Sequence, residues 1–147
     1  ENKRDLLISQ GADHVLIDNG TLKDQLLGLY PTGVNKVLEL IGPATLLESA
    51  NLLRHHGIVC ATGILGKKGT IDNFYPIKDI PSGVYLTGFS SNYPTQKIMD
   101  DIFNRIKIHK LHPTIVKVFS LAEIGQAHQL MENNEANGKV VIRINQE

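Results

Sequence analysis

The chain has 147 residues and a formal net charge of +0, with 41% apolar and 20% charged residues. This length suits about one ordinary domain, and the composition is that of a chain with a hydrophobic core rather than a disordered one. The balanced charge argues against a nucleic-acid partner, because there is no excess of basic residues to attract a polyanion. The single cysteine, Cys60, excludes an intramolecular disulfide and a multi-cysteine zinc site.

The sequence also lacks the signals of a membrane or secreted protein. No apolar run approaches the roughly 20 residues of a membrane-spanning helix. The opening Glu1–Asp5 has neither an initiator Met nor the basic-then-apolar pattern of a secretory signal. We therefore expect no membrane partner and a cytoplasmic location.

Apolar periodicity divides the chain into alternating helices and strands. Glycines that follow periodic runs mark the helix ends, and Thr21 with Asp24 and Ser120 with Glu123 match the capping box of a helix start. Residues 66–83 are predicted to be irregular. The predicted elements are helices at 3–10, 22–29, 43–57, about 94–111 and 120–133, and strands at 14–17, 34–41, 58–64, 84–89, 114–119 and 138–144.

This order of elements predicts an α/β fold with a mainly parallel sheet and right-handed crossovers. In such sheets ligands sit at the carboxyl ends of the strands, so Thr62 and Gly63, which follow a strand, are candidate ligand neighbours. The alternative is that they belong to a flexible loop. The chain has no G-x-G-x-x-G turn, no P-loop, no metal-ligand spacing among its histidines and no complete catalytic constellation.

Four segments, in order, resemble the medium-chain dehydrogenases and reductases, and most closely their quinone oxidoreductase branch. The resemblance covers essentially the whole chain. The segments are Lys3–Val15, Val37–Gly42, Leu53–Gly63, and Phe119–His128 followed by Gly138–Val141.

The resemblance implies that the chain is the carboxyl-terminal part of a longer enzyme. The expected fold is a partial Rossmann domain, a doubly wound parallel sheet that lacks its first strand-helix-strand, over residues 1–112. Residues 113–147 would be a strand-helix-strand tail of the catalytic domain. The family's zinc ligands and most of its substrate pocket lie outside this segment, so no metal is expected in this chain. The strand at 15–17 would lose its neighbours and must re-pair, swap or detach. Exposed sheet edges, including the strand at 84–89, predict a homo-oligomer.

The resemblance also implies cofactor contacts for NADP or NAD. Lys3 matches a lysine near the adenosine 2′-phosphate of NADP, although a surface lysine is an equal alternative, and Asp18 stands where some NADP-using relatives have a tyrosine. The strand ends that border the nicotinamide ribose and ring, the segment near the nicotinamide and the basic position near the pyrophosphate carry the remaining contacts. These are Ile41, Gly42, Thr62, Gly63, Phe89 and Lys139, the last with a rim lysine as its alternative.

The resulting hypothesis is a fragment of an NAD(P)H-dependent oxidoreductase, with a small-molecule substrate and no catalytic residue within the chain. The reaction would be hydride transfer that reduces a quinone, enone or carbonyl, or oxidises an alcohol. The fragment alone is expected to be inactive, because the pyrophosphate turn is absent. The alternatives are a complete, non-enzymatic α/β ligand-binding or regulatory module and an inert assembly domain.

Overall fold

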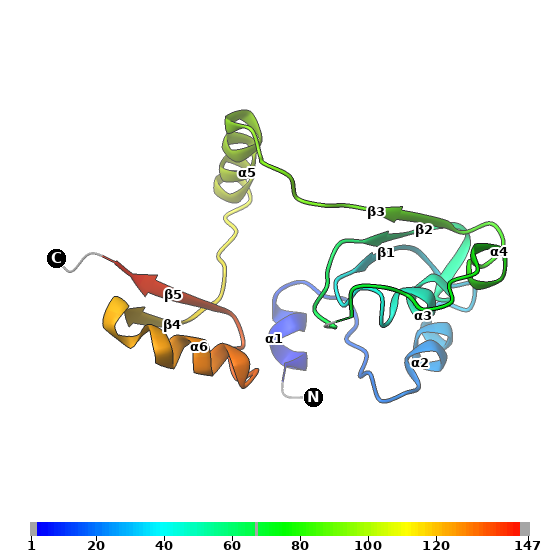
Figure 1. Ribbon diagram of the computed structural model, residues 1–147, viewed down its shortest axis with the longest axis horizontal. Coiled ribbons are helices and arrows are strands. Elements are labelled where there is room, and N and C mark those ends of the chain that lie inside the picture. Colours follow the sequence, from blue (N-terminus) through cyan, green and yellow to red (C-terminus); the bar gives the residue numbers. More distant parts are fainter. Residues whose placement is uncertain (1–2, 67, 145–147) are drawn as a thin grey trace. The chain divides into compact units, whose positions relative to one another are not determined.

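The computed structural model describes residues 3–66 and 68–144 and divides the chain into two compact units, residues 1–92 and 93–147 (Figure 1). Each unit contains parallel strands and helices, so the predicted α/β class is confirmed. The first unit contains α1 (Arg4–Ser9), α2 (Leu22–Leu29), β1 (Val34–Glu39), α3 (Leu46–Ala50), β2 (Leu53–Ala61), α4 (Pro76–Asp79) and β3 (Tyr85–Gly88). The second unit contains α5 (Gln96–Ile108), β4 (Ile115–Ser120), the 3-10 turn η1 (Leu121–Glu123), α6 (Ile124–Glu132) and β5 (Lys139–Arg143).

The first unit is built on a three-stranded parallel sheet in the order β1-β2-β3. Glu39 pairs with Ala61, and Ala61 pairs with Gly88, so the three strands end side by side. The short helix α3 packs on β1 and β2, and its Leu46 and Ala50 form the core with the fully buried Val59 of β2. This core fixes the carboxyl-terminal edge of the sheet.

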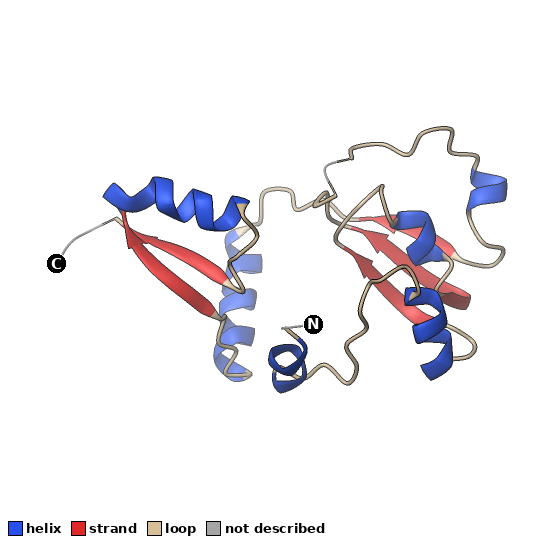
Figure 2. Cartoon of the chain, turned by 90° about the horizontal axis from the view of Figure 1, so that it is seen from below, coloured by secondary structure: helices blue, strands red, loops and turns tan. Residues whose placement is uncertain are grey.

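The second unit has a two-stranded parallel sheet of β4 and β5, connected by α6 (Figure 2). The predicted capping box at Ser120 and Glu123 is present: the Glu123 carboxylate accepts the Ser120 backbone N–H at 2.9 Å. Phe119 and Ala127 are the buried apolar side chains of this unit. The local helix-start signal therefore fixes the chain reversal after β4.

The predicted strand at 14–17 does not form, since these residues belong to no ladder of the described sheets. The backbone of Ile17 is satisfied by a side chain instead: its N–H donates to Gln25 Oε1 at 3.3 Å, and Gln25 Nε2 donates to its carbonyl oxygen at 2.8 Å. One amide side chain on α2 thus takes the place of a neighbouring strand for Ile17.

The predicted helix at 43–57 is also wrong over its second half. The structure has only the five residues of α3, and β2 already begins at Leu53, which pairs with Val34. Leu53 continues the helical spacing of Leu46 and Ala50, yet pairing with β1 determines its conformation. His56 follows at a φ of 63°, beside an irregular register of the ladder. Tertiary pairing has overridden the local period.

Other differences concern element ends and one helix start. The strand expected at 34–41 ends at Glu39, the helix expected at about 94–111 spans 96–108, and α4 lies in the segment predicted as irregular. No capping bond forms at Thr21, whose hydroxyl donates to Asn19 Oδ1 at 2.6 Å. The domain boundary at residues 112 and 113 stays a prediction.

Candidate functional site

The carboxyl ends of the three parallel strands carry most of the predicted cofactor residues. Ile41 and Gly42 follow β1, Thr62 and Gly63 follow β2, and Phe89 follows β3. Because the paired strands end in register, these residues are brought to one edge of the sheet. This is the edge at which open parallel sheets hold their ligands.

Hydrogen bonds tie the three strand ends to one another. The backbone N–H groups of Thr62 and Gly63 donate to the Glu39 carbonyl oxygen at 3.0 and 3.1 Å. The Thr62 hydroxyl donates to the Phe89 carbonyl oxygen at 3.3 Å, and the Phe89 N–H donates to the Ala61 carbonyl oxygen at 2.9 Å. The segments after β1, β2 and β3 therefore form one connected edge.

Two glycines are required where the first two segments cross. Gly42 has a φ of 95°, and a Cβ added there would meet the carbonyl oxygen of Gly63. A Cβ added at Gly63 would in turn meet the carbonyl oxygen of Leu40. The backbones lie against each other here, so any larger residue would force them apart.

Glu39, a residue that the sequence pattern did not single out, is the most buried polar group at this edge. Its side chain is 5% exposed and is the one buried polar or charged side chain among the described residues. Its Oε1 accepts the backbone N–H of Ile41 at 2.8 Å and of Gly42 at 3.2 Å. Burial alone would raise the pKa of Glu39, but its hydrogen bonds together hold that pKa below its ordinary value.

The Glu39 contacts also determine what the turn after β1 can bind. The N–H groups of Ile41 and Gly42 are occupied by a carboxylate, so they do not offer a cradle for a phosphate. Apolar side chains remain at this edge, with Ile41 41% and Phe89 62% exposed. The edge therefore suits an uncharged, partly apolar portion of a ligand better than an anionic one.

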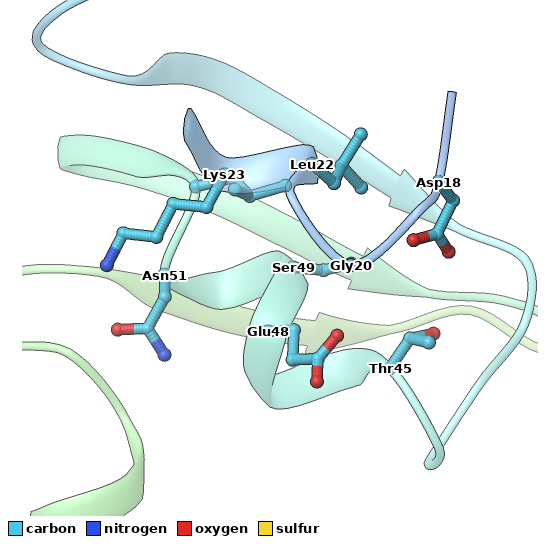
Figure 3. Close-up of a pocket in the computed structure, with 9 residues that line it drawn as sticks. Asp18, Gly20, Leu22, Lys23, Thr45, Glu48, Ser49 and Asn51 are labelled. Carbon is cyan, nitrogen blue, oxygen red and sulfur yellow. The ribbon is translucent and has the colours of Figure 1, made fainter. Parts of the chain in front are cut away.

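A separate groove of about 520 Å³ lies between the start of α2, with the segment before it, and the region of α3 (Figure 3). Asp18, Gly20, Leu22 and Lys23 line one side of it, and Thr45, Glu48, Ser49, Asn51 and Leu52 line the other. None of the predicted cofactor residues lines this groove. Its charged side chains are two acids, Asp18 and Glu48, and one lysine, Lys23, so the groove does not carry charge of a single sign.

The two lysines that were predicted to contact phosphate groups are distant in sequence from the strand-end residues. Lys3 is exposed immediately before α1, and Lys139 begins β5 in the second unit. Their expected contacts with phosphate groups stay predictions.

Metal-binding clusters and membrane-spanning helices are both absent from the part of the chain that the structure describes. No group of three His, Cys, Asp or Glu side chains among these residues is arranged to hold a metal ion. None of the helices that they form is long and apolar enough to cross a bilayer.

Comparison with known proteins identifies the family of the chain. A family model described as zinc-binding dehydrogenase matches residues 10–142. Quinone oxidoreductase-like protein 2 of Bos taurus is 26% identical over 98% of this chain and 43% of its own length. The mitochondrial NAD(P)H oxidoreductase RTN4IP1 of Danio rerio is 32% identical over 46% of this chain and 17% of its own length.

The fold is shared with solved dehydrogenase structures. The alcohol dehydrogenase of Aeropyrum pernix superposes with a TM-score of 0.78 at 24% identity, covering 97% of this chain and 40% of that one. The chain thus spans less than half the length of the relatives that it matches almost throughout. The Rossmann-type fold expected from the resemblance is confirmed.

Proposed function

This chain belongs to the zinc-binding dehydrogenase family, and from that membership we propose that it is the carboxyl-terminal part of an NAD(P)-dependent oxidoreductase. The proposed reaction of the whole enzyme is hydride transfer that reduces a quinone, enone or carbonyl, or oxidises an alcohol. The names of two relatives, a quinone oxidoreductase-like protein and an NAD(P)H oxidoreductase, support this class of reaction.

The observation that carries the proposal is the connected edge formed by the three strand ends. Gly42 and Gly63 let the backbones after β1 and β2 lie against each other, which brings these segments together at the edge where open parallel sheets hold ligands. The edge also exposes the apolar side chains of Ile41 and Phe89. These features fit the ribose and nicotinamide part of a dinucleotide.

The residues of this chain would hold the cofactor rather than perform chemistry. In the proposal Ile41, Gly42, Thr62 and Gly63 border the nicotinamide ribose and ring, and Phe89 lies near the ring. Lys3 would contact a 2′-phosphate and Lys139 the pyrophosphate. The bound cofactor supplies the hydride, and the protein orients it and excludes water. No catalytic residue or metal ligand is assigned within the chain.

The proposal includes three statements about the protein as a whole. The 147-residue chain by itself is inactive, because it contains no G-x-G-x-x-G turn for the pyrophosphate. The protein is cytoplasmic. It is a homo-oligomer that associates through sheet edges, with β3 as the candidate edge.

The test compares the 147-residue chain with the product of the full reading frame. NADPH and NADH oxidation is followed by absorbance in the presence of a quinone or an enone. We expect turnover by the full product and none by the chain alone. Turnover by the chain alone would refute its inactivity. A reading frame without an upstream G-x-G-x-x-G turn, or a full product that binds neither cofactor, would support a non-enzymatic binding module instead.

A further inference from the structure

The Glu39 carboxylate joins the turn after β1 to the helix α3, which also packs on β1 and β2. Its Oε1 accepts the N–H groups of Ile41 and Gly42, and also the Thr45 hydroxyl at 3.1 Å. Its Oε2 accepts the hydroxyl of Ser49, one turn further along. One buried side chain thus connects the turn after β1 to Thr45, which precedes α3, and to Ser49, near the end of α3.

The same residue contacts the second candidate cofactor segment through its main chain. The Glu39 carbonyl oxygen accepts the N–H groups of Thr62 and Gly63. Substitution of the side chain leaves this main-chain contact in place. The side chain therefore acts on the turn at Ile41 and Gly42, and its role can be tested separately from that of the β1–β2 pairing.

The turn needs such a constraint. Gly42 lies in the left-handed region at a φ of 95°, and its backbone lies too close to the Gly63 segment to admit a side chain. Glycine has the greatest backbone freedom, so its own conformational preference does not hold this turn. The carbonyl oxygens of Ile41 and Gly42 accept backbone N–H groups, and their N–H groups are held by Glu39. Hydrogen bonds to a charged, buried acceptor are stronger than those between neutral groups, and they do hold it.

We propose that Glu39 is a positioning residue for the nicotinamide cofactor. It fixes the backbone of Ile41 and Gly42 in the conformation that receives the nicotinamide ribose, and it does not touch the cofactor itself. This inference rests on the proposed function. It predicts that removal of the carboxylate weakens cofactor binding while the chemical step is unchanged once the cofactor is bound.

Two substitutions at Glu39 separate hydrogen bonding from charge. Glu39→Met keeps the length of the side chain and removes both acceptors. Glu39→Gln keeps one oxygen for the three donors at Oε1, and its amide can donate to the Ser49 hydroxyl after that group rotates. Glu48→Met makes the same change at an exposed acid on α3 and is the matched control.

The experiment uses the product of the full reading frame. The Kd for NADPH and NADH is measured by calorimetry, KM and kcat with a quinone or enone, and hydrogen exchange by mass spectrometry of the peptide that contains residues 40–45. For Glu39→Met we expect the cofactor Kd and KM to rise about tenfold, as the loss of several hydrogen bonds to a charged group implies. The kcat stays unchanged, and exchange at Ile41 and Gly42 becomes faster.

The conservative variants complete the test. Glu48→Met should bind the cofactor as the unaltered protein does. Glu39→Gln keeps an acceptor for the turn but loses the charge, so its Kd should rise less than that of Glu39→Met. If Glu39→Met does not fold, the combined substitutions Thr45→Val and Ser49→Ala remove the two hydroxyl groups that donate to the Glu39 carboxylate. A rise in Kd smaller than that of Glu39→Met is then expected.

The possible failures are distinguishable. An unaltered protein that binds neither NADPH nor NADH contradicts the proposed function. An unaltered protein that binds the cofactor, with Glu39→Met or the double variant binding equally well, overturns the positioning role. A fall in kcat at saturating cofactor would overturn it too, since it would indicate a role in the chemical step.

Discussion

At the scale of single residues, the carboxyl group of Glu39 couples stability to pH. Its folded pKa is lowered, although burial alone would raise it, because its hydrogen bonds outweigh the desolvation. A carboxyl group whose pKa is lowered by folding stabilises the protein above the pKa of the unfolded chain, about 4.3. This contribution is lost as the pH falls through the lower, folded pKa.

We therefore predict that Glu39→Gln flattens the acid limb of the stability curve. The unaltered chain should lose stability as the pH falls below about 4.3, and the variant should lose less of it over the same interval. Urea midpoints measured at fixed pH values give the comparison. Glu48→Gln, at an exposed acid of the same unit, should follow the unaltered chain. Parallel curves for all three proteins would show that Glu39 carries no such contribution.

At the scale of elements, the sequence predicted correctly those helices and strands whose local pattern agrees with their tertiary surroundings. The strands at 34–39 and 115–120 and the helix at 22–29 are of this kind. It failed where pairing partners decide. Leu53 has helical spacing but joins a parallel ladder, and residues 14–17 have a strand pattern but no neighbour among the described strands. No local pattern contains this information.

The same distinction explains the candidate site. The position of Thr62 and Gly63 at the sheet edge was predictable, because strand ends in a parallel sheet meet at one edge; their contact with a cofactor stays a prediction. Glu39 was missed because it lies inside an apolar run and was counted as part of a strand. A signal was present: two hydroxyls, Thr45 and Ser49, follow at helical spacing and provide donors for a buried acid. Only the folded turn shows that they converge on it.

The two predicted capping boxes give a test at this scale. At Ser120 both hydrogen bonds of the box form, whereas at Thr21 the side chain makes no capping bond. Ser120→Ala should lower the free energy of unfolding by about 1 kcal/mol, the ordinary value of a helix cap. Thr21→Ala should cost less, since it removes no cap. Thermal unfolding followed by circular dichroism in the far ultraviolet measures both. Equal losses would mean that the box at Ser120 does not stabilise its helix.

At the scale of the whole molecule, apolar groups remain exposed on edges and faces. β1 and β3 are the outer strands of the first sheet, and their Leu38 and Tyr85 are 65% and 55% exposed. In the second unit α5 exposes Ile98 and Phe103, at 48% and 61%. Unpaired edges and apolar patches of this kind promote association between chains.

The prediction at this scale concerns β3, whose outer edge has no partner among the described strands. We expect the protein to be a homo-oligomer through this edge. Thr87→Lys places a charge at an exposed position in the middle of β3, and lysines on edge strands oppose pairing. Light scattering after size-exclusion chromatography should therefore show an oligomer for the unaltered protein and a larger monomer fraction for the variant.

Thr32→Lys, in the exposed turn before β1, makes the same change away from this edge and should leave the oligomer intact. A monomeric unaltered protein at the highest concentration reached would contradict association altogether. An oligomer insensitive to Thr87→Lys would instead assign the contact to another surface, such as the exposed face of α5.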